Sequence, residues 1–150
     1  MADHKAEQIV AAVVTKVTGL TTTSTRVYRG RVEDLPDVQA PALGVFMGPD
    51  EPRTDGGSSS YRYIDGDLTV FVEAYSKKTL AADIEPQLNL IRKEVTIALQ
   101  ADVTQGLAFV LDTQEGDAVP DRSGAGDQPA GTLRMSWVLR YRRLRTDPSQ

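Results

Sequence analysis

The sequence contains no cysteine, and this absence excludes several kinds of site at once. Without thiols the chain has no disulfide framework, no cysteine nucleophile and no thiolate-bound metal ion. A cysteine-free composition also fits a reducing compartment. Any stabilisation must therefore come from packing and hydrogen bonding rather than from covalent cross-links.

Histidine is almost as scarce, because His4 is the only one in the chain. A Ser-His-acid triad needs a histidine base, and a residue this close to the terminus is expected to be solvated and loosely held. The sequence also has no Gly-x-Ser-x-Gly elbow and no glycine-rich phosphate loop. We expect no enzyme activity and no bound cofactor.

Long apolar runs are missing as well. No run approaches the roughly 18 residues that a membrane-spanning helix needs, and the acidic, amphipathic start does not read as a signal peptide. Hydrophobic residues make up 40% of the 150 residues and charged residues 25%, which is enough for a real core. We expect residues 1–150 to form a single domain that neither spans a membrane nor carries its own export signal.

Two segments show helical periodicity, with apolar residues three and four positions apart. Residues 3–18 form the first, with Asp3 as a possible cap and Gly19 as the end. Residues 79–100 form the second and main helix. Pro86 is its discordant residue: either it kinks the helix, or the regular helix starts there, since proline is favoured in a first turn.

Five segments show strand character: 25–30, 43–47, 61–75, 106–115 and 131–145. With only two helices and irregular connections, this order predicts an α+β fold, a mostly antiparallel sheet of about five strands with two helices packed on one face.

The third strand, 61–75, has two readings. Asp65-Gly66 is a possible hairpin turn, but we favour a continuous strand that starts near Ile64. In the fourth strand, 106–115, we expect Leu107, Phe109 and Leu111 to share one face.

Glycine, proline and serine gather in two long connections, near 48–60 and 116–130. Connections of this length without secondary structure are usually functional or unfolded. The tail, residues 146–150, is expected to be loose.

The last strand has the clearest alternation. The odd-numbered residues from Leu133 to Tyr141, including Trp137, are apolar or aromatic and are expected to face the core. The other face is basic. Five arginines fall between residues 131 and 146 without a single acid: Arg134, Arg140, Arg142, Arg143 and Arg145.

The preceding segment has the opposite charge, with six acids and one arginine between residues 101 and 130. A solvated surface explains either segment, but like charges side by side repel, so the arginine row favours an anionic partner. That partner is either nucleic acid or the acidic segment of a neighbouring copy. The candidate acids are Asp112, Glu115, Asp117, Asp121 and Asp127.

Asp65 and Asp67 form one further acidic pair, which we expect to lie on a solvated strand face. A calcium loop that began at Asp65 would need a glutamate at its twelfth position, where Ser76 stands. We therefore expect no metal site.

The segment Asp67-Leu68-Thr69-Val70-Phe71-Val72-Glu73-Ala74-Tyr75 leads directly into the main helix, which ends Ile97-Ala98-Leu99-Gln100. Together with the N-terminal helix, the short strand pair, the long connections and the basic final strand, this arrangement resembles the tail terminator proteins of long-tailed bacteriophages, of the minor tail protein U type of lambdoid phages.

The resemblance implies a structural protein of the virion tail, assembled in the host cytoplasm. It implies a ring of six copies that caps the tail tube protein and meets a head-completion or connector protein, with nucleic acid present only as DNA passing through the ring. Two alternatives remain: another virion component, such as a head–tail connector or tail-tube protein, and a small nucleic-acid-binding module that uses the basic strand.

Overall fold

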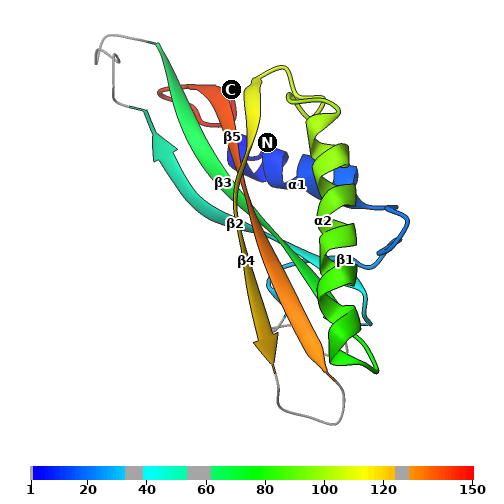
Figure 1. Ribbon diagram of the computed structural model, residues 1–150. Helices are drawn as coiled ribbons and strands as arrows, with labels where there is room; N and C mark the ends of the chain where they lie inside the picture. Colours follow the sequence, from blue (N-terminus) through cyan, green and yellow to red (C-terminus); the bar gives the residue numbers. More distant parts are fainter. Residues whose placement is uncertain (1, 33–38, 54–61, 124–128) are drawn as a thin grey trace.

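The computed structural model describes residues 2–32, 39–53, 62–123 and 129–150. A five-stranded sheet carries the fold, with strand order β1-β2-β3-β5-β4 (Figure 1). β1 pairs with β2 in parallel and all other pairs are antiparallel, which confirms the predicted α+β class. The elements in chain order are α1 (Lys5–Val17), β1 (Val27–Arg29), β2 (Ala42–Pro52), β3 (Tyr63–Lys77), the 3-10 turn η2 (Ala81–Asp83), α2 (Ile84–Gln100), β4 (Val110–Ser123) and β5 (Ala130–Leu144).

Both helices pack on the same face of the sheet, where one apolar core joins them to β2, β3 and β5. Each fully buried aliphatic side chain contributes about 1.5–3 kcal/mol, so this shared core is the main source of stability. The buried helical residues are Ala6, Ile9, Val10, Val13 and Val17 of α1 and Ile84, Leu88, Ile91, Val95 and Leu99 of α2.

The start of α1 differs from the expected cap. His4, not Asp3, is the N-cap residue, and its Nδ1 accepts a hydrogen bond from the Ala6 amide at 3.0 Å. The only histidine is therefore exposed, as expected, but has a structural role at the first turn. At the other end Gly19 follows the helix with a positive φ of 90°, a conformation that glycine adopts without strain.

The main helix is shorter than its periodicity suggested. The turn η2 precedes Ile84, and Leu80, an apolar residue inside the predicted helix 79–100, is exposed. Pro86 lies in the first turn of α2, where its missing amide hydrogen needs no partner. Of the two readings of this proline, the one in which the regular helix starts there is correct.

β3 is one continuous strand through Asp65-Gly66, as favoured from the sequence. The fourth predicted strand was placed too early: β4 starts at Val110, which is buried, whereas Leu111 is 42% exposed. A register irregularity between Val110 and Asp112 interrupts the alternation at this point.

The two predicted loops are largely strand. β2 continues to Pro52 and β4 to Ser123, so parts of 48–60 and 116–130 pair with β3 and β5. Both strands carry proline where only one side is paired, which is where a sheet tolerates it. Residues 54–61 and 124–128 lie outside the described part of the chain.

Residues 146–150, expected to be loose, make backbone hydrogen bonds to two elements. The Pro148 carbonyl accepts from the Lys5 amide at 2.9 Å, and the Gln150 carbonyl accepts from the Leu144 amide at 2.7 Å. These bonds hold the tail between the start of α1 and the end of β5.

Candidate assembly surface

The arginine row of β5 lies on the sheet face opposite the helices. All odd-numbered residues from Leu133 to Tyr141 are buried, and Trp137 has no exposed surface. The alternation predicted for this strand is therefore confirmed. The even-numbered arginines Arg134, Arg140 and Arg142 point to the other face, where no helix of the described chain covers them.

These three arginines are paired with acids of their own chain, which corrects the expectation that they lack an internal counterpart. Arg142 donates from Nε to Asp65 Oδ1 at 2.7 Å and from Nη2 to Asp65 Oδ2 at 3.0 Å. Arg140 lies 3.2 Å from Asp67. Together with Arg134, described next, these pairs form a ladder of opposite charges between β3 and β5, because residues directly opposite in neighbouring strands interact.

The third rung is different because its acid is buried. Arg134 Nε lies 3.5 Å from a carboxylate oxygen of Glu73, which is only 3% exposed and also accepts the Val32 amide at 3.0 Å. The Arg134 guanidinium also lies 5.7 Å from the ring centroids of Phe46 and Phe71. This rung holds the segment after β1 against the sheet.

A signal for the ladder was present in the sequence. Asp65, Asp67 and Glu73 are two and six residues apart on β3, and their partners have the same spacings in reverse order on β5. Reversed spacing is what antiparallel pairing requires. It identifies the pairs only once the two strands are known to be neighbours.

The ladder predicts that the contribution of Asp65 to the free energy of unfolding depends on pH. The hydrogen bonds from Arg142 lower the pKa of this carboxyl, and the charges of Arg140 and Arg53 act in the same direction. The pKa of Asp65 in the folded chain therefore lies below its value of about 3.9 in the unfolded chain. The stabilisation by the Asp65–Arg142 pair is fully present above the unfolded pKa and is lost as the pH falls through the folded pKa.

We therefore expect Asp65→Asn to lower the free energy of unfolding by about 1 kcal/mol or less near neutral pH, because the pair is partly exposed. The difference from wild type should shrink as the pH falls through the folded pKa of Asp65. Urea unfolding at about pH 7 and about pH 2.5 measures both values. Asp83→Asn, at an exposed carboxylate without a side-chain cap bond, is the matched control. An equal loss at both pH values would contradict this assignment.

Two arginines of the row lie beyond the ladder, at the end of β5. Arg143 is half-buried and Arg145 is exposed, and the Arg145 amide donates to the Arg62 carbonyl at 2.9 Å. The exposed Arg62 guanidinium lies 5.8 Å from the centroid of the Tyr63 ring, which is 51% exposed. We call Arg62, Tyr63, Arg143 and Arg145 the arginine corner.

The acidic candidates lie on an edge strand rather than in a loop. Asp112 is opposite Arg140 in register, and Glu115 bonds Arg92 of α2 at 3.1 Å. Asp117 and Asp121 are exposed and make no ion pair within the described ranges. Asp127 lies outside the described residues. We call the β4 segment Gln114–Asp121 the acidic arm.

The structure does not bring the acidic arm and the arginine corner together. β4 runs antiparallel to β5, so Asp121 pairs with Thr132 near the start of β5, whereas Arg143 lies near its end. Figure 1 shows these strand ends at opposite ends of the sheet. Any contact between the two surfaces must therefore involve another molecule.

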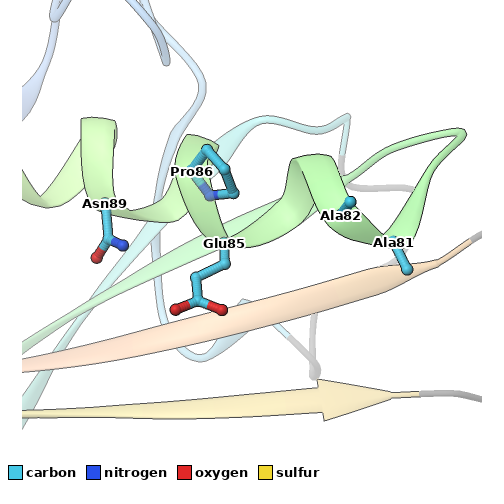
Figure 2. A pocket seen from close by; sticks show the side chains of 5 residues that line it. All are labelled: Ala81, Ala82, Glu85, Pro86 and Asn89. Carbon is cyan, nitrogen blue, oxygen red and sulfur yellow. The ribbon is translucent and has the colours of Figure 1, made fainter.

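One pocket lies beside the first turn of α2 (Figure 2). Its lining holds a single ionisable group, Glu85, together with Ala81, Ala82, Pro86 and Asn89.

The described ranges contain no group of three or more histidine, cysteine or acidic residues placed to hold a metal ion. None of the helices in these ranges is long and apolar enough to cross a bilayer.

Comparison with solved structures gives a remote likeness. A chain from the virion of a native gene transfer agent particle is similar with a TM-score of 0.47 and 13% sequence identity, covering 93% of this chain and 88% of that one. No family model matches the sequence, and no curated protein does.

Proposed function

We propose that this chain is a structural, non-catalytic protein of a phage tail, a tail terminator that forms a ring on the end of the tail tube. The ring caps the tube protein and presents its other side to a head-completion or connector protein. It acts in the virion, after assembly in the host cytoplasm, and DNA passes through its opening.

The observation that carries this proposal is the pair of outer strands that project from the helix-covered centre of the sheet. The β2 segment Met47–Pro52 and the acidic arm are almost entirely exposed. They extend toward opposite ends of the sheet (Figure 1). Two different surfaces at opposite ends of one subunit are what a heterologous, ring-closing contact requires.

The order of elements gives further support. The resemblance to tail terminators rests on the order of the elements, and the chain has this order: α1, the strand pair β1 and β2, β3 leading into α2, and the final strands β4 and β5. Another virion component, such as a head–tail connector or tail-tube protein, is the alternative.

The alternative of a nucleic-acid-binding module is weakened by the ladder. Three of the five arginines already face acids of β3, so a phosphate backbone would have to compete with those carboxylates. Trp137 and Tyr141, the aromatics of the same strand, are buried and offer no stacking platform.

The test is assembly on a tube. The purified chain is analysed by native mass spectrometry and negative-stain electron microscopy, alone and mixed with tail tubes built from the tube protein of the same genome. We expect annular particles, or rings bound to tube ends. A chain that stays monomeric and never binds tubes would overturn the proposal.

A further inference from the structure

We propose that α2 carries a second contact surface on its outward side, and that a second copy of this chain packs there as an antiparallel helix pair around a two-fold axis. The surface consists of Pro86, Leu90, Lys93 and Ile97, which we call the outer ridge. It lies on α2 rather than on the outer strands β2 and β4, so the proposal goes beyond the proposed ring and does not depend on it.

The outer ridge is a second stripe on a helix that already has a buried one. Its members are four, three and four residues apart, which places them on one face of a helix. All four are exposed, with Leu90 47% and Ile97 61% accessible. Apolar residues at this spacing form the seam along which one helix packs on another. The opposite face of α2 is the one in the core, with Ile84, Leu88, Ile91, Val95 and Leu99.

The two flanks of α2 are occupied by the chain itself. On one side Arg92 lies 3.1 Å from Glu115 of β4. On the other side a carboxylate oxygen of Glu94 accepts the Thr22 amide at 3.3 Å. In the described part of the chain, the outer ridge is therefore the side of this helix that is left uncovered.

The outer ridge has a hollow at its start and a protruding side chain near its end. The hollow is the pocket of about 480 Å³ at the first turn of α2, which Pro86 lines together with its neighbours (Figure 2). Ile97 lies twelve residues after Glu85 of this hollow, roughly 18 Å along the axis at 1.5 Å per residue. In an antiparallel pair the end of one helix covers the start of the other. Each Ile97 then enters the hollow of the other copy, and Leu90 lies near the axis.

The charges on this surface select the antiparallel arrangement. Lys93 belongs to the second half of α2 and Asp83 stands at its N-terminal end, and neither side chain has an ionic partner within the described ranges. Antiparallel packing brings Lys93 of one copy toward Asp83 of the other, whereas parallel packing brings like charges together. The helix dipoles favour the same choice. A two-fold axis forms both ion pairs and fills both hollows at once, because every contact in such an interface occurs twice.

The absence of native cysteine allows a direct cross-linking test on the purified chain. Leu90→Cys treated with a short bismaleimide should give covalent dimers and nothing larger, because the two copies of residue 90 meet near the axis. Ile97→Cys should stay uncross-linked, since its two copies lie roughly 18 Å apart. Ala82→Cys/Ile97→Cys should again give dimers only. A series of higher oligomers from this double variant would show a head-to-tail contact and overturn the two-fold pair.

Ile97→Lys tests the protruding side chain. We expect the dimer dissociation constant to rise on the order of tenfold or more, because lysine does not fit an apolar contact, while the free energy of unfolding stays that of wild type. Val119→Lys is the matched control, since Val119 is similarly exposed at 59% but lies on β4. It should dimerise like wild type. Sedimentation equilibrium measures the dissociation constants.

A charge exchange tests the orientation. Lys93→Glu should weaken the dimer, because it faces Asp83 of the other copy, and Asp83→Lys/Lys93→Glu should restore it with the signs reversed. A double variant as weak as Lys93→Glu would contradict the antiparallel orientation.

The dimer is measured on the free chain without tubes, so its outcome is separate from that of the proposed function. A chain that is monomeric at every concentration, or a dimer that Ile97→Lys leaves intact, overturns this inference while binding to tube ends still supports the ring. A chain that dimerises through the outer ridge but never binds tubes overturns the proposed function alone.

Discussion

Trp137→Ala is expected to lower the free energy of unfolding by about 3–5 kcal/mol, the usual range for removing a large buried aromatic side chain. Trp137 has no exposed surface and stands in the central part of β5, between Val70 of β3 and Glu115 of β4 in register. Its removal leaves a cavity where the strand meets the shared core. Urea unfolding followed by far-UV circular dichroism measures the loss.

Trp137→Phe is the matched control. The indole Nε1 has no hydrogen-bond partner among the described residues, so phenylalanine removes a buried donor without breaking a bond. We expect it to cost clearly less than alanine. A cost below about 1 kcal/mol for Trp137→Ala would contradict the burial of this face.

Gly44→Ala is expected to be the second most damaging change, at about 3 kcal/mol, the upper part of the usual range for overpacking. An added Cβ would lie 2.5 Å from the Gly30 carbonyl oxygen and 3.0 Å from Cγ2 of Val32. The first of these atoms belongs to the backbone, so it cannot rotate away. The crossing of residues 30–32 over β2 would have to shift, and with it the bond from the Val32 amide to Glu73.

Gly106→Ala separates this clash from ordinary glycine strain. Gly106 has a φ of 74°, and no atom lies within 4 Å of its would-be Cβ. Its replacement should cost only the left-handed conformation, about 1–2 kcal/mol. Equal losses for the two variants in thermal or urea unfolding would show that the crossing is not tightly packed over Gly44.

The sequence alone located the elements whose apolar pattern is strong. The stripe of α2 and the alternation from Leu133 to Tyr141 were correct because burial on one face imposes a period on the chain. The outer strands were missed where that period fails. The distal parts of β2 and β4 are exposed on both faces and show no alternation. Gly48, Pro49 and Pro120 therefore led to the prediction of loops in these segments.

The candidate surface, too, was only partly predictable from the sequence. The opposite charges of 101–130 and 131–146 are visible in the sequence, but their partners are not. An unpaired row of arginines was the expectation, and the structure replaces it with three rungs to β3 and a smaller corner of cations.

Composition and periodicity by themselves determined the α+β class, the inward face of β5 and the lack of thiols, since these depend on residue type and local spacing. Only the tertiary structure decided which charges neutralise one another and which surfaces lie apart. Register between strands distant in sequence sets those contacts, and no local pattern encodes it.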